Sequence, residues 1–226
     1  MNKHLLLILC AIATLLLGAL PWVVLEKAPA EASMNVYYKI FFLHLPLAWW
    51  ALFSFFTVFL SSILYLVKRK NCFDAWAKCA TETGVLFCAL AIISGSIWAK
   101  LAWNTWWRWE PKLTTSLIVC LLYASCIIVR GMQAEPAKKQ VIAAVLGIIA
   151  FVDVPFVFLS TKILPSVHPP AIVTQTNALD FGMILALIYS LLALGLLWLC
   201  LTLLGFNQEK IKVRLTQLKA GFMEKI

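Results

Sequence analysis

The sequence has 226 residues, of which 63% are hydrophobic and 13% are charged. A soluble domain of this length does not bury so much apolar surface in one core, so the composition excludes a soluble globular protein and makes the lipid bilayer the solvent. Only helices and closed barrels satisfy every backbone polar group in lipid, and the continuous apolar runs favour helices.

Six segments contain about the 20 apolar residues that a membrane-spanning helix needs. The prediction is therefore an all-α fold, a polytopic membrane helical bundle with six transmembrane helices and a single integral membrane domain over residues 1–226. In chain order the predicted spans are Leu5–Leu25, Leu45–Val67, Thr83–Trp103, Leu113–Val129, Val141–Leu159 and Phe181–Leu204.

The first span has some features of a signal peptide. Lys3 precedes it, and the triplets Ala28-Pro29-Ala30 and Ala30-Glu31-Ala32 resemble cleavage sites. Its apolar run is longer than a signal peptide requires, which favours an uncleaved anchor.

Lysine and arginine are concentrated on one side of this topology. Thirteen of the nineteen lie in the amino-terminal tail, the second and fourth connections and the carboxy-terminal tail. Basic residues are retained in the cytoplasm, so both termini are predicted to be cytoplasmic and the first, third and fifth connections periplasmic. The expected location is the bacterial inner membrane. Topology and contact with anionic membrane lipid explain the net charge of +9, so we expect no nucleic acid partner.

The chain has three histidines, and two of them fall at the predicted periplasmic boundary. His44 opens the second span and His168 lies in the fifth connection, whereas His4 is in the cytoplasmic tail. Two neutral imidazoles on opposite faces of a porphyrin form a six-coordinate iron site with no position left for oxygen. A purely structural alternative stays open at this point, in which His44 caps its span and His168 is an ordinary loop residue.

The third connection, about residues 98–114, is rich in tryptophan. Five of the ten tryptophans fall within twelve positions, and Arg108, Glu110 and Lys112 are interleaved with them or follow closely. An aromatic belt at the membrane interface accounts for two or three of these indoles. The remainder suit a flat apolar macrocycle, which needs rigid aromatic surface together with a few charged donors. Nearby, Lys100 is expected to pair with Asp153, since charges in spans usually find partners.

Several catalytic motifs do not occur in the sequence. Without C-x-x-C or C-x-x-C-H, the chain neither carries covalently attached heme nor exchanges dithiols, so its seven cysteines are read as packing residues. Without a P-loop or a Ser-His-Asp arrangement, any ATP-driven step belongs to another subunit, and we expect no classical enzyme.

The tryptophan-rich loop resembles the signature of a heme-handling superfamily, and within it the family of cytochrome c maturation protein C (heme exporter protein C). The family pattern is Trp-Gly-Thr-Trp-Trp-x-Trp-Asp-x-Arg-Leu-Thr, and here Asn104, Glu110 and Lys112 replace its glycine, aspartate and arginine. The stretch around His44 is similar to Phe-x-His-x-Pro-x-Ala-Trp, and His168 begins a His-x-Pro. The resemblance covers roughly residues 35–170. Positions that match the loop pattern are Trp103, Thr105, Trp106, Trp107, Trp109, Leu113 and Thr114.

The resemblance implies that the chain binds heme b at the periplasmic face and delivers it to a heme chaperone (maturation protein E). An ATP-binding cassette complex with maturation proteins A, B and D would then release the loaded chaperone. By the same resemblance, His44 and His168 are the axial ligands of the iron. Arg108 and Lys112 facing the propionates is our own expectation. The implied aromatic platform consists of Trp103, Trp106, Trp107 and Trp109.

Three other functions remain open at this stage. The Glu110-Pro111-Lys112 run resembles the Trp-Asp-Pro-Lys form of the cytochrome c synthase branch, although this chain has little periplasmic domain to recognise an apocytochrome. A cytochrome b-type electron-transfer subunit would carry its histidines inside the spans. A heme transporter would need polar residues at mid-membrane, and no such cluster is present in the sequence.

Overall fold

The computed structural model describes residues 3–29, 36–163 and 180–223, and this part of the chain is almost entirely helical, with no strand. Six helices or helix pairs in it are long and apolar enough to cross a membrane, which confirms the predicted number of spans. The helices are α1 (Lys3–Trp22), α2 (Phe41–Lys68), α3 (Asn71–Trp103), α4 (Pro111–Gly131), α5 (Pro136–Phe151), α6 (Asp153–Ile163) and α7 (Phe181–Met223), with short π and 3₁₀ turns at Val23–Lys27 and Val36–Ile40.

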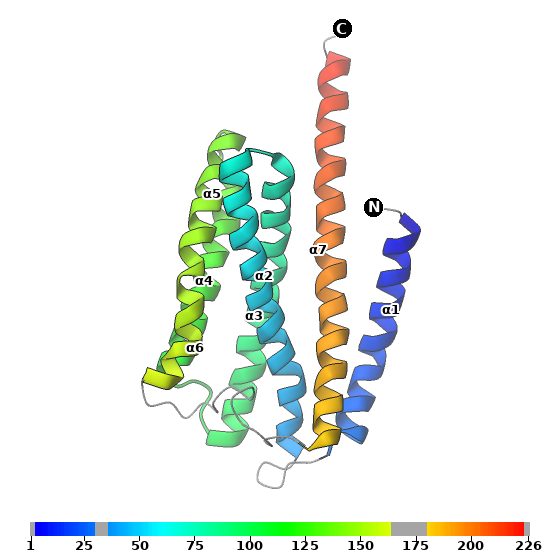
Figure 1. Cartoon of the computed structure of the whole chain (residues 1–226), viewed down its shortest axis with the longest axis vertical. Coiled ribbons are helices and arrows are strands. Elements are labelled where there is room, and N and C mark those ends of the chain that lie inside the picture. Colours follow the sequence, from blue (N-terminus) through cyan, green and yellow to red (C-terminus); the bar gives the residue numbers. More distant parts are fainter. Residues whose placement is uncertain (1–2, 30–35, 164–179, 224–226) are drawn as a thin grey trace.

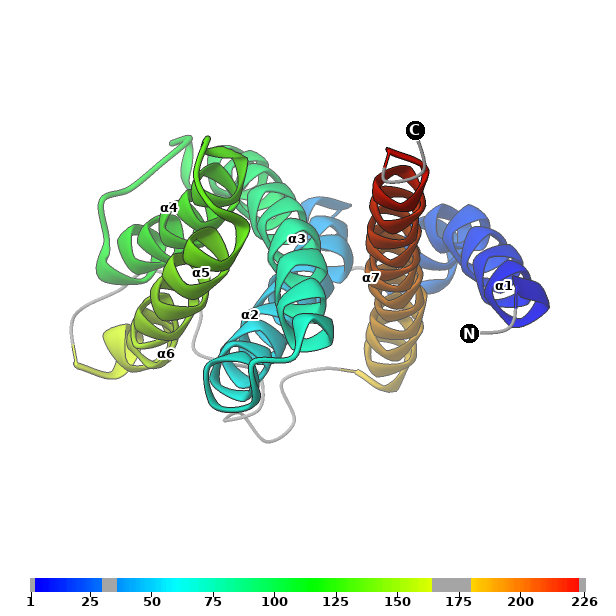
Figure 2. The same cartoon turned by 90° about the horizontal axis from the view of Figure 1, so that it is seen from above.

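Helices α2 and α3 form the centre of the bundle. They share the most extensive helix–helix interface, with α4, α5 and α6 on one side and α7 followed by α1 on the other (Figure 2). Gly84 of α3 permits the close approach, because a Cβ atom there would lie 2.9 Å from Ser54 Cβ and 2.9 Å from Phe55 Cε1 of α2. Small residues allow such contact between helices in a membrane, where packing drives association.

Buried aromatic and polar side chains join the two halves to this centre. The Phe55 ring stacks on Tyr123 of α4 with centroids 3.9 Å apart, and the Tyr123 hydroxyl donates to the Gly147 carbonyl of α5 at 3.1 Å. On the other side, Trp198 of α7 donates from Nε1 to Ser54 Oγ at 2.9 Å, and Ser54 in turn donates to a carbonyl of α3 at 2.6 Å. Helices α3, α4, α5 and α7 are therefore linked through α2.

The fifth span is interrupted near Pro155. It consists of α5 and α6, which are separated at Val152. Pro155 lacks the N–H that would bond to the residue 151 carbonyl, and just before it the Val152 N–H bonds to the Ile149 carbonyl at 3.0 Å, three residues back as in a 3₁₀ turn. The loss of one ladder hydrogen bond accounts for the break.

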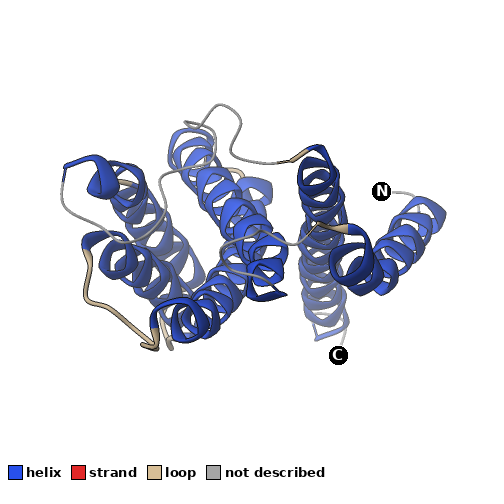
Figure 3. Cartoon of the chain, turned by 90° about the horizontal axis from the view of Figure 1, so that it is seen from below, coloured by secondary structure: helices blue, strands red, loops and turns tan. Residues whose placement is uncertain are grey.

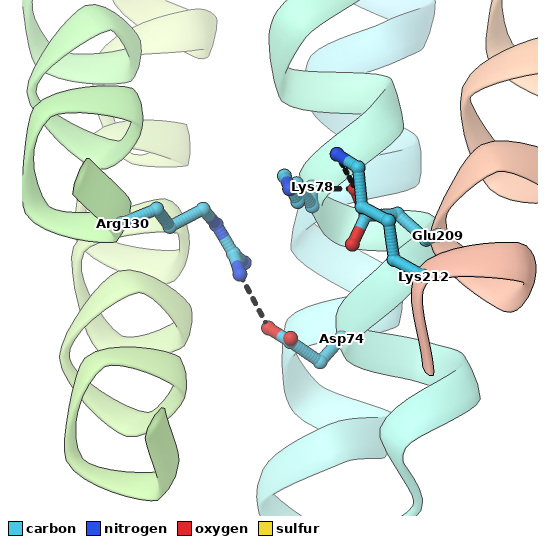
Figure 4. A network of polar contacts seen from close by, with 5 residues as sticks. All are labelled: Asp74, Lys78, Arg130, Glu209 and Lys212. Atoms are coloured by element: carbon cyan, nitrogen blue, oxygen red, sulfur yellow. Dashed lines mark hydrogen bonds and ion pairs between the residues drawn. The ribbon is translucent and has the colours of Figure 1, made fainter. Parts of the chain in front are cut away.

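Two predicted spans are shorter than the helices that the structure shows. Helix α3 begins at Asn71 rather than Thr83, and α7 continues past Leu204 to Met223. Polar residues in the added turns are stabilised by ion pairs between helices: Asp74 with Arg130 of α4 at 2.7 Å, and Lys78 with Glu209 of α7 at 2.8 Å (Figure 4).

Both chain ends lie at one end of the bundle, together with the α2–α3 and α4–α5 turns (Figure 1). The connection between α3 and α4 lies at the opposite end, with the start of α2, the end of α6 and the start of α7. Figure 3 shows this opposite end from below. The arrangement agrees with the predicted alternation of connections, while the assignment of the two ends to cytoplasm and periplasm stays a prediction.

Candidate functional site

His44 lies in the first turns of α2 and is held by α3. Its Nδ1 atom is 2.9 Å from the Ala91 carbonyl oxygen and 3.3 Å from Ser94 Oγ. A carbonyl oxygen only accepts hydrogen bonds, so Nδ1 of the neutral ring is the donor and Nε2 carries the lone pair. The bond therefore fixes both the tautomer and the ring orientation, as carbonyl partners do for histidines that ligate metals.

Gly95 gives the His44 ring its space. A Cβ atom on Gly95 would lie 2.8 Å from His44 Cε1 and 3.2 Å from Nδ1, closer than carbon and nitrogen atoms pack. Any larger residue at this position would displace the ring from the Ala91 carbonyl. The sequence analysis did not identify Ala91, Ser94 or Gly95, and its available signal was the Ser94-Gly95-Ser96 run of small residues in an otherwise bulky span.

An aromatic series connects His44 to the tryptophan loop. The His44 ring centroid is 6.2 Å from that of Trp98, and Trp98 is 5.9 Å from Trp103. Trp98 is buried, with 5% of its surface exposed, so it packs as the inner member of the series. The sequence analysis placed Trp103 in the platform and left Trp98 out, although Trp98 is the indole nearest to the histidine among the ring contacts described here.

Asn104 ends α3 in the left-handed conformation, with φ of 55° and ψ of 25°. Glycine and asparagine are the residues that adopt this conformation most readily at the end of a helix. The departure from the family glycine at this position therefore preserves the backbone turn. Asparagine adds a contact, because Lys100 donates from Nζ to Asn104 Oδ1 at 2.8 Å.

The expected pair between Lys100 and Asp153 is wrong. Lys100 bonds to Asn104 within its own helix end, and none of the ion pairs found between described residues joins it to Asp153. Asp153 Oδ2 is buried and has no hydrogen-bond partner among the described residues. Local capping of α3 thus satisfies the lysine that sequence reasoning assigned to a partner in another span.

The rest of the loop presents indoles outward. Trp106 and Trp109 are 60% and 78% exposed, and Trp107 is half-buried with its ring edge-to-face to Trp109 at 5.9 Å. Thr105 donates to the Trp107 carbonyl at 3.0 Å, which tightens the loop. Two large apolar rings thus lie accessible at the end of the bundle where α2 begins.

The two candidate cationic residues differ in their surroundings. Arg108 is exposed, whereas Lys112 is half-buried in the first turn of α4. The Lys112 cation lies within electrostatic range of His44, and the Glu110 carboxylate lies within range of Lys112. Lys112 is therefore the cation that the fold brings near the histidine.

The second predicted iron ligand, His168, lies outside the described residues. The helices on either side of its connection, α6 and α7, have their adjoining ends at the same end of the bundle as the start of α2 (Figure 1). Its role as an axial ligand stays a prediction.

The chain was compared with known protein families and curated proteins. A family model described as heme exporter protein C matches residues 1–220. The chain belongs to the heme exporter protein C family. It is 29% identical to the heme exporter protein C of Bradyrhizobium diazoefficiens over 211 residues, which are 92% of this chain and 80% of that protein. The corresponding values are 27% for the Escherichia coli protein, with 78% and 72% covered, and 30% for the Paracoccus denitrificans protein, with 59% and 61% covered.

Membership of the family confirms the resemblance found in the tryptophan loop and implies a role in heme handling for cytochrome c maturation. Together with six helices of membrane-spanning length, it identifies a multi-pass protein of the bacterial inner membrane. The match favours this family over the cytochrome c synthase branch.

The turn at Asn104 generates a prediction about the loop. Asn104→Val should lower the free energy of unfolding by about 1–3 kcal/mol, because a β-branched residue is strained in the left-handed region. Asn104→Gly should stay within 1 kcal/mol of the original, which is about the size of one hydrogen bond. Thermal unfolding in detergent, with protease cleavage of residues 104–110, measures both. Equal destabilisation by the two variants would mean that the Lys100 bond, and not the backbone turn, organises the loop.

Proposed function

We propose that this chain binds heme b at the periplasmic face of the inner membrane, between His44 and His168, and delivers it to the heme chaperone (maturation protein E). The observation that carries the proposal is the hydrogen bond from His44 Nδ1 to the Ala91 carbonyl, 2.9 Å long. It leaves Nε2 as a preorganised ligand beside an exposed aromatic loop. Bis-histidine ligation holds heme without leaving a position for oxygen chemistry.

The residues present fit a porphyrin. Its flat face requires broad apolar surface, which Trp106 and Trp109 offer by their exposure and which Trp103 and Trp107 extend toward the bundle. Trp107 Nε1 is buried and has no hydrogen-bond partner within the described part of the chain, so it is a donor for a polar group of the cargo. Arg108 and Lys112 are the cations that we assign to the propionates.

Heme itself supplies the vinyl group at which the chaperone becomes covalently attached. The proposed role of this chain is to hold the heme and to orient it. His44, held by α3, would ligate the iron, and the loop indoles would support the apolar face of the porphyrin. Because Trp106 and Trp109 are exposed, the chaperone would reach a heme held against them without unfolding of the site.

The proposed partners follow from the family. We propose that the chain works with the ATP-binding cassette complex formed with maturation proteins A, B and D, which supplies the ATP-driven step that this sequence has no motif to perform. A cytochrome b-type function is disfavoured, because His44 lies near the start of the Tyr37–Lys68 span rather than in its middle.

Loss of an axial ligand is the first test. His44→Ala and His168→Ala should each remove most of the heme that copurifies with the chain and abolish its low-spin bis-imidazole absorption. His4→Ala, at the opposite end of the bundle, is the matched control and should retain heme. Heme content per protein, measured as the pyridine complex, gives the answer; full retention in both variants would refute the ligand assignment.

Substitution of Gly95 should weaken heme binding at the same site, although Gly95 does not contact the iron. Gly95→Ala places a methyl group against the His44 ring and should weaken heme retention roughly 10-fold or more, the usual cost of disturbing a histidine's supporting hydrogen bond. Gly84→Ala creates a clash of similar closeness in the same helix pair but away from His44. Heme titration of both variants separates the two effects. Equal losses would indicate that Gly95 serves only helix packing.

Delivery of heme is tested by measuring how much heme is covalently attached to the co-expressed chaperone. Trp106→Ala and Trp107→Ala should lower the yield of loaded chaperone several-fold, because the ring loses its aromatic support. Trp76→Ala is the control, since Trp76 stacks on Phe206 near the other end of the bundle. Normal loading with both loop variants would remove the platform from the proposal.

A further inference from the structure

Helix α7 extends beyond the rest of the bundle at the end that carries both chain termini (Figure 1). Its last contacts with α3 are well defined: the Phe206 ring stacks on Trp76 with centroids 4.8 Å apart, and the Glu209 carboxylate accepts from Lys78 at 2.8 Å. Every described side chain from Lys210 to Lys219 is exposed. At about 1.5 Å per residue, this segment runs roughly 15 Å along the helix axis.

The contact at Glu209 fixes which face of the projecting segment points away from the bundle. Successive helix residues are rotated by about 100°, so Ile211, Leu215 and Leu218 lie on the side opposite Glu209. They form one apolar stripe and are 60%, 50% and 56% exposed. The outward face of α7 is thus apolar although no helix of this chain covers it in the described structure.

Cations border this stripe on both sides. Lys210 and Arg214 follow one edge, and Lys212 and Lys219 follow the other. The Lys210 ammonium also lies 4.6 Å from the centroid of the Phe206 ring. Glu209 is the one acidic residue between positions 209 and 219, and its carboxylate is engaged by Lys78 and Lys212. A binding partner that matches this surface has an apolar seam edged by carboxylates.

The geometry of this surface favours a partner protein over a membrane surface or a second copy of the chain. A helix that binds a membrane surface lies in the plane of the interface, whereas this one continues along the axis of the bundle (Figure 1). A second copy of the chain would bring its own rows of lysine and arginine against these, which is repulsive. An acidic amphipathic segment meets both the apolar stripe and its borders.

We propose that the projecting end of α7, residues 210–219, is a docking surface for an acidic, amphipathic segment of a partner protein on the side of the membrane where both termini lie. The surface is at the end of the bundle opposite to His44. It is independent of the proposed heme site, and the two can fail separately.

The test is photo-crosslinking in cells that express the full chain. p-Benzoylphenylalanine replaces Leu215 in the stripe or, as the matched control, Gln217 on the side that faces Glu209. We expect an adduct from position 215 whose crosslinked peptide has apolar residues spaced as on one helix face and flanked by Asp or Glu. Position 217 should give at least 5-fold less of it.

Charge reversal completes the test. Arg214→Glu with Lys219→Glu should reduce the adduct at least 5-fold, and exchange of the flanking acids of the partner for lysine should restore it. Because both residues lie beyond the packed bundle, heme content should be unchanged, which checks folding. An adduct with lipid alone, with a second copy, or with a peptide lacking acids would overturn the proposal. So would equal labelling from both positions or no adduct at all.

Discussion

The hydrogen bond between His44 Nδ1 and the Ala91 carbonyl is the interaction on which the site depends. It forms between α2 and α3, so it exists only while these helices stay in their present register. A one-residue slip along either helix would carry the imidazole away from the carbonyl and rotate it toward lipid or protein. The extensive α2–α3 interface holds that register, and Gly95 leaves room for the His44 ring within it.

Polar contacts inside the bundle specify how the outer helices attach to this pair. Hydrogen bonds between membrane helices contribute only about 0.6 kcal/mol each, so packing of rings such as Phe55 and Tyr123 provides most of the association energy. The buried pair of Asp74 and Arg130 is better understood as a constraint on arrangement than as a source of stability. A misplaced α4 would leave that arginine without its carboxylate.

The two ends of the bundle carry different features and are connected by the same helices. The ion pairs and the projecting end of α7 lie at the end with both termini (Figures 1 and 4). His44 and the tryptophan loop between α3 and α4 lie at the other. A heme-handling end and a protein-docking end would then be joined by the rigid helices α3 and α7. Both helices contact α2, which carries His44.

Much of the fold was accessible to sequence reasoning because hydropathy alone defines membrane-length segments. Six spans and the alternation of connections were predicted correctly, and so was the family, through the tryptophan pattern. Contacts between distant residues were not accessible: Ala91 and Gly95 matter through their distance from a histidine about fifty positions away. The Lys100 prediction failed because a helix-end asparagine was nearer than the aspartate in another span, and α3 exceeded its predicted start because Asp74 and Lys78 are neutralised by partners on α4 and α7.

The most direct measurement of the central claim is the protonation of the His44 ring nitrogens in heme-free protein. Nitrogen-15 NMR of histidine-labelled chain in detergent, with His44 assigned by its loss in His44→Gln, distinguishes protonated from bare ring nitrogens. The account predicts a proton on Nδ1 and a bare Nε2 at neutral pH, with this preference lost in Gly95→Ala. A proton on Nε2 and a bare Nδ1 would contradict it, because the lone pair of the ring would then face the Ala91 carbonyl and Nε2 could not ligate iron.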